Sequence, residues 1–116
     1  MFETINRDAV ILAPKKSFVD WINRIYPNEK ISYSDPLEHD KASIYLLPER
    51  ENPEASLKYL KANFKPILKE ELMACTTDED SWPMELTWEL FNEWFHISIQ
   101  SMIVDTIDDK ISKDDF

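Results

Sequence analysis

The first part of the chain contains two kinds of hydrophobic pattern, a continuous apolar run and then a helical repeat. Residues 9–13 form a short apolar run that ends at Pro14, which indicates a buried strand. An apolar side chain then recurs every three or four residues, which is typical of an amphipathic helix. This stripe consists of Phe18, Trp21, Ile22 and Ile25. We expect Ser17 to cap the helix, with Asp20 as its capping-box partner, and Pro27 to end it.

The middle of the chain predicts a loop and a second strand. Residues 28–42 are polar and form the loop, in which residues 31–33 are the one candidate for a short extended piece. Residues 43–47 are apolar and rich in strand-forming side chains, and Pro48 closes this run.

A long helix follows over residues 53–75. Asn52 is a good capping residue and Pro53 suits the first helical position. The apolar stripe of this helix consists of Leu57, Leu60, Phe64, Ile67, Leu68 and Leu72. Pro66 interrupts the stripe, and because an interior proline removes a hydrogen bond, we expect a kinked helix or two abutting ones.

The last third predicts a loop, a short aromatic helix and a third strand. The loop covers residues 76–84, and Thr87 caps the helix, which we expect to end near Phe95. One side of this helix carries Trp88, Leu90, Phe91, Trp94 and Phe95, and the other carries Glu89, Asn92 and Glu93. From there the pattern alternates with period two, which favours a strand over residues 96–106, with a continued helix as the competing interpretation.

Together these elements predict an α+β fold of two layers, with helices packed on one face of an approximately three-stranded sheet. The expected order is β-α-β-α-α-β. We expect one domain over residues 1–106, followed by an acidic, frayed tail over residues 107–116.

Charge divides the chain into two unequal parts. The 116 residues carry a formal net charge of −10, but residues 1–69 are close to neutral, at +1, and residues 70–116 carry −11. An acidic half of this kind should repel nucleic acids and anionic membranes and attract a basic protein partner, whereas the plain alternative is that it serves solubility.

The chain contains no glycine and a single cysteine, and both facts exclude classes of site. The phosphate-binding loop, the dinucleotide fingerprint and the nucleophile elbow all need glycine. One cysteine excludes an internal disulfide and a multi-cysteine zinc site. The first residues have no basic start or long apolar run, so we expect no secretion signal and a cytoplasmic location.

Candidate chemistry is sparse, and from spacing alone we expect no cofactor, no catalytic residue and no metal site. Asp78 and Asp80, with His96, are the best candidates for a divalent-metal or small enzyme site, but a solvated acidic loop is the favoured explanation of the two carboxylates. Cys75 could act as a nucleophile with His96 as base and Asp105 as orienter, but a partly buried thiol at a helix C-terminus is the commoner outcome. His39 lies in a polar loop and offers no further pattern.

The densest feature is a set of tryptophans among acids. Most of these rings belong in the core, yet one exposed beside carboxylates would suit protein binding. Base stacking would need interleaved basic residues, and none are present. Our candidate partner-binding residues are Asp78, Asp80, Trp82, Trp88, Glu89, Glu93 and Trp94. The leading hypothesis is a small acidic interaction or regulatory module that binds a basic protein, and self-association as a homodimer remains open.

Several blocks of the sequence resemble a group of short, acidic, uncharacterised bacterial proteins. These blocks are Pro14-Lys15-Lys16-x-Phe18-x-x-Trp21, Tyr45-Leu46-x-Pro48-Glu49, Thr77-Asp78-Glu79-x-Ser81-Trp82-Pro83 and Phe91-x-x-Trp94-Phe95. The resemblance implies a bacterial cytosolic single-domain protein, and it implies no activity.

Overall fold

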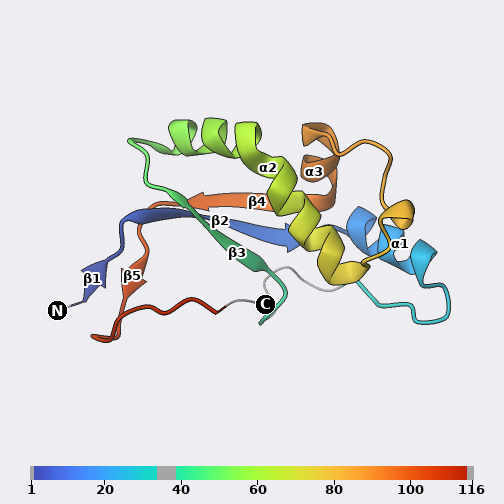
Figure 1. Ribbon diagram of the computed structural model, residues 1–116, viewed down its shortest axis with the longest axis horizontal. Helices are drawn as coiled ribbons and strands as arrows, with labels where there is room; N and C mark the ends of the chain where they lie inside the picture. Colours follow the sequence, from blue (N-terminus) through green and yellow to red (C-terminus); the bar gives the residue numbers. More distant parts are fainter. Residues whose placement is uncertain (1, 34–38, 115–116) are drawn as a thin grey trace.

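The computed structural model describes residues 2–33 and 39–114 and confirms the α+β fold (Figure 1). Its centre is a three-stranded sheet in which β2 (Arg7–Pro14) lies between β3 (Ser43–Pro48) and β4 (Phe95–Gln100). Both pairings are antiparallel, and Val10 is the partner of Tyr45 on one side and of Ile99 on the other. The three strands therefore match the three apolar or alternating runs of the sequence.

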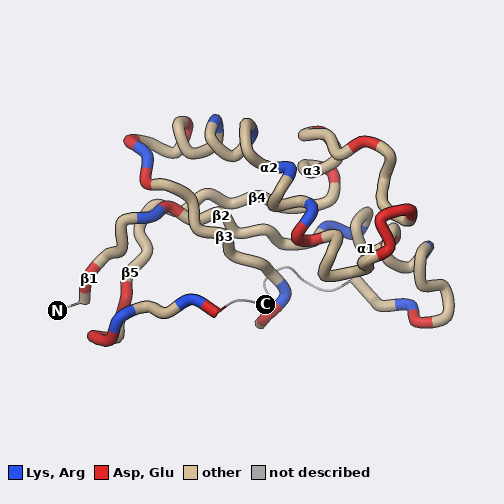
Figure 2. Tube along the Cα trace, in the orientation of Figure 1, with Lys and Arg blue, Asp and Glu red and all other residues tan. Residues whose placement is uncertain are grey.

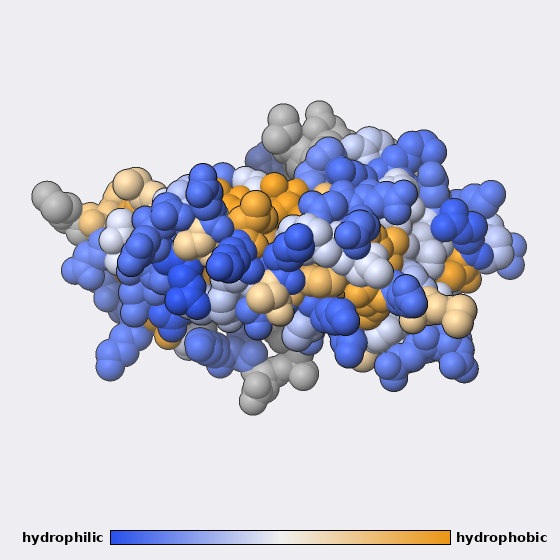
Figure 3. Space-filling model, turned by 90° about the horizontal axis from the view of Figure 1, so that it is seen from above, coloured by the Kyte–Doolittle hydropathy of each residue, from blue (hydrophilic) through white to orange (hydrophobic). Residues whose placement is uncertain are grey.

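Three helices pack against one face of this sheet. They are α1 (Lys16–Ile25), α2 (Pro53–Cys75) and α3 (Trp88–Trp94), and each contributes buried side chains to a single apolar cluster. Figure 1 shows α2 lying along the sheet, with α3 beside it and α1 at the end of β2. Figure 3 looks onto this helix layer, where hydrophilic side chains dominate and frame smaller apolar areas. The cluster includes Val10, Leu12, Phe18, Trp21, Leu47, Leu60, Phe64, Leu68, Leu72, Phe91, Trp94 and Phe95.

Helix α2 is kinked, as the sequence predicts. Asn52 caps it by accepting a hydrogen bond of 2.8 Å from the Ala55 amide, and Pro53 occupies the first turn. The backbone leaves helical geometry at Asn63, where φ is −130° and ψ is 17°. Pro66 lies three residues further on, and its missing N–H and bulky ring disturb the preceding turn. The kink lets both halves of α2 bury leucines against the sheet.

The predicted cap of the first helix is wrong. The helix begins at Lys16, Lys15 occupies the capping position, and no side chain caps this end. Ser17 instead donates a hydrogen bond to the Glu93 carbonyl, and Asp20 forms an ion pair with Lys16. The hydroxyl therefore bonds to a carbonyl of another helix, whereas the local pattern predicted a capping box.

The predicted strand over residues 96–106 is present only in part, and the competing continued helix is wrong. Strand β4 ends at Gln100, which pairs with Ala9, and a second short strand, β5 (Val104–Asp105), pairs with β1 (Glu3–Thr4). Residues 101–103 lie outside both strands, just as residues 5 and 6 separate β1 from β2 on the paired side.

Two further segments have no regular structure. Residues 106–114 form neither helix nor strand, and their side chains are exposed. Residues 31–33 are not a strand, and the backbone of Ile31 bonds through both its amide and its carbonyl to the Asn23 side chain. Within the described ranges, no helix combines the length and the apolar character needed to cross a bilayer.

Candidate functional site

The C-terminal end of α3 is held by the junction between β2 and α1. The Lys15 ammonium donates to the Asn92 carbonyl at 2.8 Å, and the Ser17 hydroxyl donates to the Glu93 carbonyl at 2.6 Å. The Lys15 amide donates to the Trp94 carbonyl at 2.7 Å. These are the last carbonyls of a helix, which lack partners within the helix and carry its negative dipole end. Two segments far apart in sequence are thereby locked together.

Aromatic rings fill the space behind this junction. The Trp94 ring lies 5.0 Å, centroid to centroid, from both Phe18 and Trp21, and Phe18 lies 4.7 Å from Phe95. The rings are tilted against one another, which is a favourable arrangement for aromatic pairs. All four side chains are buried, so this cluster forms the rigid floor beneath the surface described next.

The loop after α2 brings a further tryptophan to this floor. The indole N–H of Trp82 donates to the Thr76 carbonyl at 3.1 Å, which fixes the ring at the end of the short 3₁₀ helix η1 (Glu79–Ser81). Asp78 caps η1, accepting from the Asp80 amide and from the Ser81 hydroxyl. Trp82 is only half-buried, so part of its ring faces solvent.

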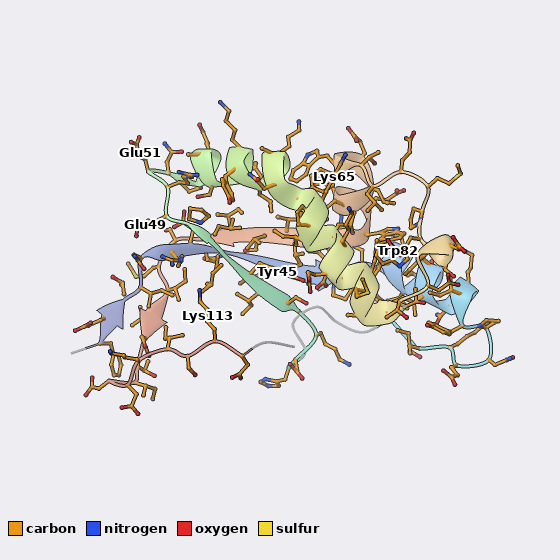
Figure 4. All side chains as sticks on the ribbon, viewed as in Figure 1. Tyr45, Glu49, Glu51, Lys65, Trp82 and Lys113 are labelled. Atoms are coloured by element: carbon orange, nitrogen blue, oxygen red, sulfur yellow. The ribbon has the colours of Figure 1, made fainter. Side chains whose placement is uncertain are left out.

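A surface hollow of about 430 Å³, here called the aromatic depression, opens between α1, η1 and α3. It is lined by Ser17, Asp20, Trp21, Arg24, Ser81, Trp82, Pro83, Leu90, Glu93 and Trp94. Figure 4 shows Trp82 beside η1 at the end of the molecule where these elements meet. The hollow is open to solvent rather than enclosed.

Charge around the aromatic depression is mostly negative. Asp20 and Glu93 contribute carboxylates to the lining, Arg24 contributes one cation, and the acids of η1 lie beside it. Figure 2 shows the acidic residues of η1 gathered at this end, while lysines follow α2. The Lys16–Asp20 ion pair, at 3.1 Å, is exposed and therefore weak, so it leaves Asp20 able to exchange partners.

Three of the seven predicted partner-binding residues line the aromatic depression: Trp82, Glu93 and Trp94. Asp78 and Asp80 do not line it. They lie on the adjacent η1 segment, where Asp78 is occupied with capping and Asp80 is exposed.

Trp88 and Glu89 belong to a different surface of α3. The Trp88 ring packs against Phe64 at 5.5 Å and against Phe91 at 5.7 Å, so it belongs to the edge of the core. Glu89 is exposed and, like Trp88, contributes nothing to the lining of the aromatic depression.

Sequence reasoning missed the contribution of α1 to this site. Asp20, Trp21 and Arg24 occupy one side of that helix, and Pro83 and Leu90 complete the wall. A signal was available, because the tryptophan-containing parts of the sequence around Trp21, Trp82-Pro83 and Trp94 all meet here. Only the fold shows that they do.

The alternative metal or enzyme site receives no support from the geometry. Asp78 and Asp80 lie on η1, whereas His96 lies on β4, opposite Ala13 of β2. Across residues 2–33 and 39–114, no three His, Cys, Asp or Glu side chains are gathered as metal ligands would be.

Cys75 lies at the end of α2 as a half-buried thiol, not as an activated one. Burial, and secondarily the nearby Glu71 carboxylate, raise the pKa of the Cys75 thiol above its ordinary value. Its carbonyl accepts a hydrogen bond of 3.0 Å from the Tyr26 hydroxyl. A nucleophilic cysteine needs the opposite shift, so the structure argues against the proposed pairing with His96 and Asp105.

Glu71 is the centre of a small polar cluster between β3 and α2. It accepts hydrogen bonds from the Tyr45 hydroxyl at 2.5 Å and from the Ser43 hydroxyl at 3.2 Å. Burial, followed by the hydrogen bond and the charge of Glu71, raises the pKa of Tyr45 far above its ordinary value. A phenol held this firmly in its protonated form joins strand to helix and is a poor proton donor for catalysis.

Comparison of the chain with protein-family models, with curated proteins and with solved structures finds no match.

Proposed function

We propose that the protein is a small interaction or regulatory module of the cytoplasm, and that it binds a basic segment of a partner protein at the aromatic depression. The observation that supports this most directly is the placement of the half-buried Trp82 in the same hollow as Asp20 and Glu93. A lysine or arginine side chain can place its charge over an indole face and pair with a carboxylate at the same time.

The rigidity of the site also supports recognition of a partner. Trp21 and Trp94 are buried and pack against each other with tilted rings, and Trp82 is fixed through its indole hydrogen bond, so little side-chain freedom is lost on binding. Anchors of this kind, surrounded by polar groups, are typical of interface hot spots.

Long-range charge supports the same kind of partner. The −11 carried by residues 70–116 accelerates the approach of a basic segment and opposes nucleic acid and anionic membrane surfaces. The net charge therefore favours the approach of a basic segment, and the shape of the hollow determines which side chains fit into it.

The experiment uses a defined probe before any natural partner. A fluorescently labelled arginine-rich peptide is titrated with the full chain at about 20 mM and at about 300 mM salt. We expect binding at the lower salt, with an affinity that falls steeply at the higher one. Glu93→Lys should weaken binding at least about tenfold, because it replaces a pairing carboxylate with a repelling charge in the hollow.

The matched control is Asp109→Lys, which makes the same change of net charge in the exposed segment after β5. This variant should lose far less affinity than Glu93→Lys. Equal losses in the two variants would show attraction by net charge alone, and peptide binding unaffected by either would remove the depression as the site. Affinity capture with wild type and Glu93→Lys then identifies partners that depend on the depression.

A further inference from the structure

The face of the sheet opposite the helices has an uneven chemical character. On β3 this face carries Ile44 and Leu46, which are 65% and 51% exposed, and the half-buried Ile11 lies next to them on β2. On β4 the same face carries the polar side chains His96, Ser98 and Gln100. Exposed apolar surface is thus concentrated at one edge of the sheet.

That edge is also open for hydrogen bonding. In the sheet order β3-β2-β4, no described strand pairs with the outer side of β3, so its outward N–H and C=O groups have no strand partner there. Edge strands are usually protected by charges or prolines within the strand. β3 contains no charged residue, its one proline, Pro48, is its last residue, and the charges Lys41 and Glu49 lie just beyond the two ends. An edge of this kind is a template for another strand.

We propose that β3 pairs with β3 of a second copy of this chain, in an antiparallel arrangement about a two-fold axis at Tyr45. Side chains alternate between faces along a strand, so the apolar faces of the two copies match only if even-numbered residues oppose even-numbered ones. Centring the pair on Tyr45 sets Ile44 of each copy opposite Leu46 of the other copy. On the helix side, the two Tyr45 rings become direct cross-strand neighbours, which is a favourable aromatic pair.

Charge complementarity selects this register among those that match the faces. With Tyr45 at the axis, Lys41 lies opposite Glu49 of the second copy at both ends of the paired strands. Shifting the register by two residues, in one direction or the other, sets Glu49 opposite His39 or opposite Ser43 of the second copy. In both shifted registers, Ile44 no longer lies opposite Leu46. Only the Tyr45-centred register satisfies the apolar and the charged pairs together. Figure 4 shows Tyr45 on β3 and Glu49 just past its end.

The dimer so formed has one continuous sheet and leaves both aromatic depressions free. No residue of β3 lines the depression, so this inference stands or fails separately from the proposed function. If both hold, the dimer presents two equivalent sites to a partner, which would increase its apparent affinity for a repetitive basic segment.

The first test is the mass of the full chain by sedimentation equilibrium over a range of concentrations. We expect a reversible dimer of the 13.8 kDa chain. Leu46→Lys should raise the dimer dissociation constant at least about tenfold, because it places a charge within the paired edge. Ser98→Lys makes a comparable change on the same face of β4 and should leave dimerisation unchanged.

The second test uses charge exchange to report the register. Lys41→Glu and Glu49→Lys should each weaken the dimer about tenfold, because each sets like charges opposite one another at both ends. Mixing the two variants should restore wild-type affinity, since every pair in the mixed dimer is again opposite in sign. Hydrogen exchange of the outward amides of residues 43–47 should slow as protein concentration rises.

Three results would overturn the proposal. One is a wild-type chain that stays monomeric at every concentration reached. Another is equal weakening by Leu46→Lys and Ser98→Lys, and the third is failure of the mixed variants to recover the dimer. Dimerisation that appears only after deletion of residues 107–116 would assign the β3 face to the chain's own C-terminal segment instead.

Discussion

Lys15 and Asn92 are joined by a hydrogen bond of 2.8 Å, although 77 residues separate them. The Lys15 ammonium donates to a carbonyl at the C-terminal end of α3, where a cation also compensates the helix dipole. This bond, with that of Ser17, holds α3 against α1 and so positions both walls of the aromatic depression.

Removing the Lys15 side chain should therefore destabilise the protein. For Lys15→Ala we expect the free energy of unfolding to fall by about 1–2 kcal/mol, because a partly buried carbonyl loses a charged donor. Lys16→Ala is the control, since Lys16 is exposed and makes only the surface pair with Asp20, and it should change stability by less than about 0.5 kcal/mol. Urea unfolding measures both, and equal effects would contradict the capping role.

Asp8 supplies a second stability prediction. Its carboxylate is 1% exposed, and one oxygen accepts from the Ser56 hydroxyl at 2.5 Å and from the Arg50 amide at 3.1 Å. The other oxygen has no hydrogen-bond partner among the described residues. Ser56→Ala should lower the free energy of unfolding by about 2 kcal/mol, because a buried carboxylate then keeps a single donor. Ser101→Ala, at an exposed serine, should have almost no effect, and a small loss at Ser56 would show that water replaces its hydroxyl.

The raised pKa of Tyr45 predicts a loss of stability in alkali. The ordinary tyrosine pKa is 10.0, and the folded state raises it through burial and through Glu71. Above about pH 10 the unfolded chain therefore releases a proton that the folded chain retains, so the stability contributed below that pH declines as the pH rises. Tyr45→Phe removes the titrating group, so its free energy of unfolding should decline less steeply above pH 10 than that of wild type. Parallel curves from urea unfolding at several pH values would contradict the assignment.

The thiol of Cys75 should react slowly in the folded protein. Because burial and Glu71 raise the pKa of the thiol, its thiolate is scarce near neutral pH, and access is also limited. We expect iodoacetamide to alkylate the folded chain more slowly than the chain unfolded in urea at the same pH. Glu71→Gln should accelerate the reaction of the folded chain, since it removes the neighbouring negative charge. A folded-state rate equal to the unfolded one would show that Cys75 is freely accessible.

Local pattern predicted the elements well where one face of an element is buried throughout. The strands at residues 9–13 and 43–47 follow from short apolar runs that end at a proline, and the kinked helix over residues 53–75 follows from helical periodicity and from Pro66. Periodicity succeeds there because burial on one side imposes the same spacing on every turn or pleat.

The same reasoning failed where a distant group decides the outcome. Ser17 has a capping residue's side chain, but a carbonyl of α3 accepts its hydrogen bond instead. The alternating run over residues 96–106 predicts one strand, but its pairing with β2 ends where Gln100 meets Ala9, and the chain pairs again only at Val104 and Asp105, with β1. In both cases the deciding partner lies more than 70 residues away in the chain.

The sequence by itself determined the α+β class, the acidic second half and the exclusion of glycine-dependent sites, because composition and local period carry that information. Tertiary structure alone decided which tryptophan remains partly open, since Trp21 and Trp94 are buried by one another while Trp82 is held at the surface by its bond to Thr76. It also decided that β3 lies at an open edge, with Ile44 and Leu46 uncovered. The order of the strands and the contacts between rings depend on long-range packing. A local sequence pattern does not specify which distant residues come into contact.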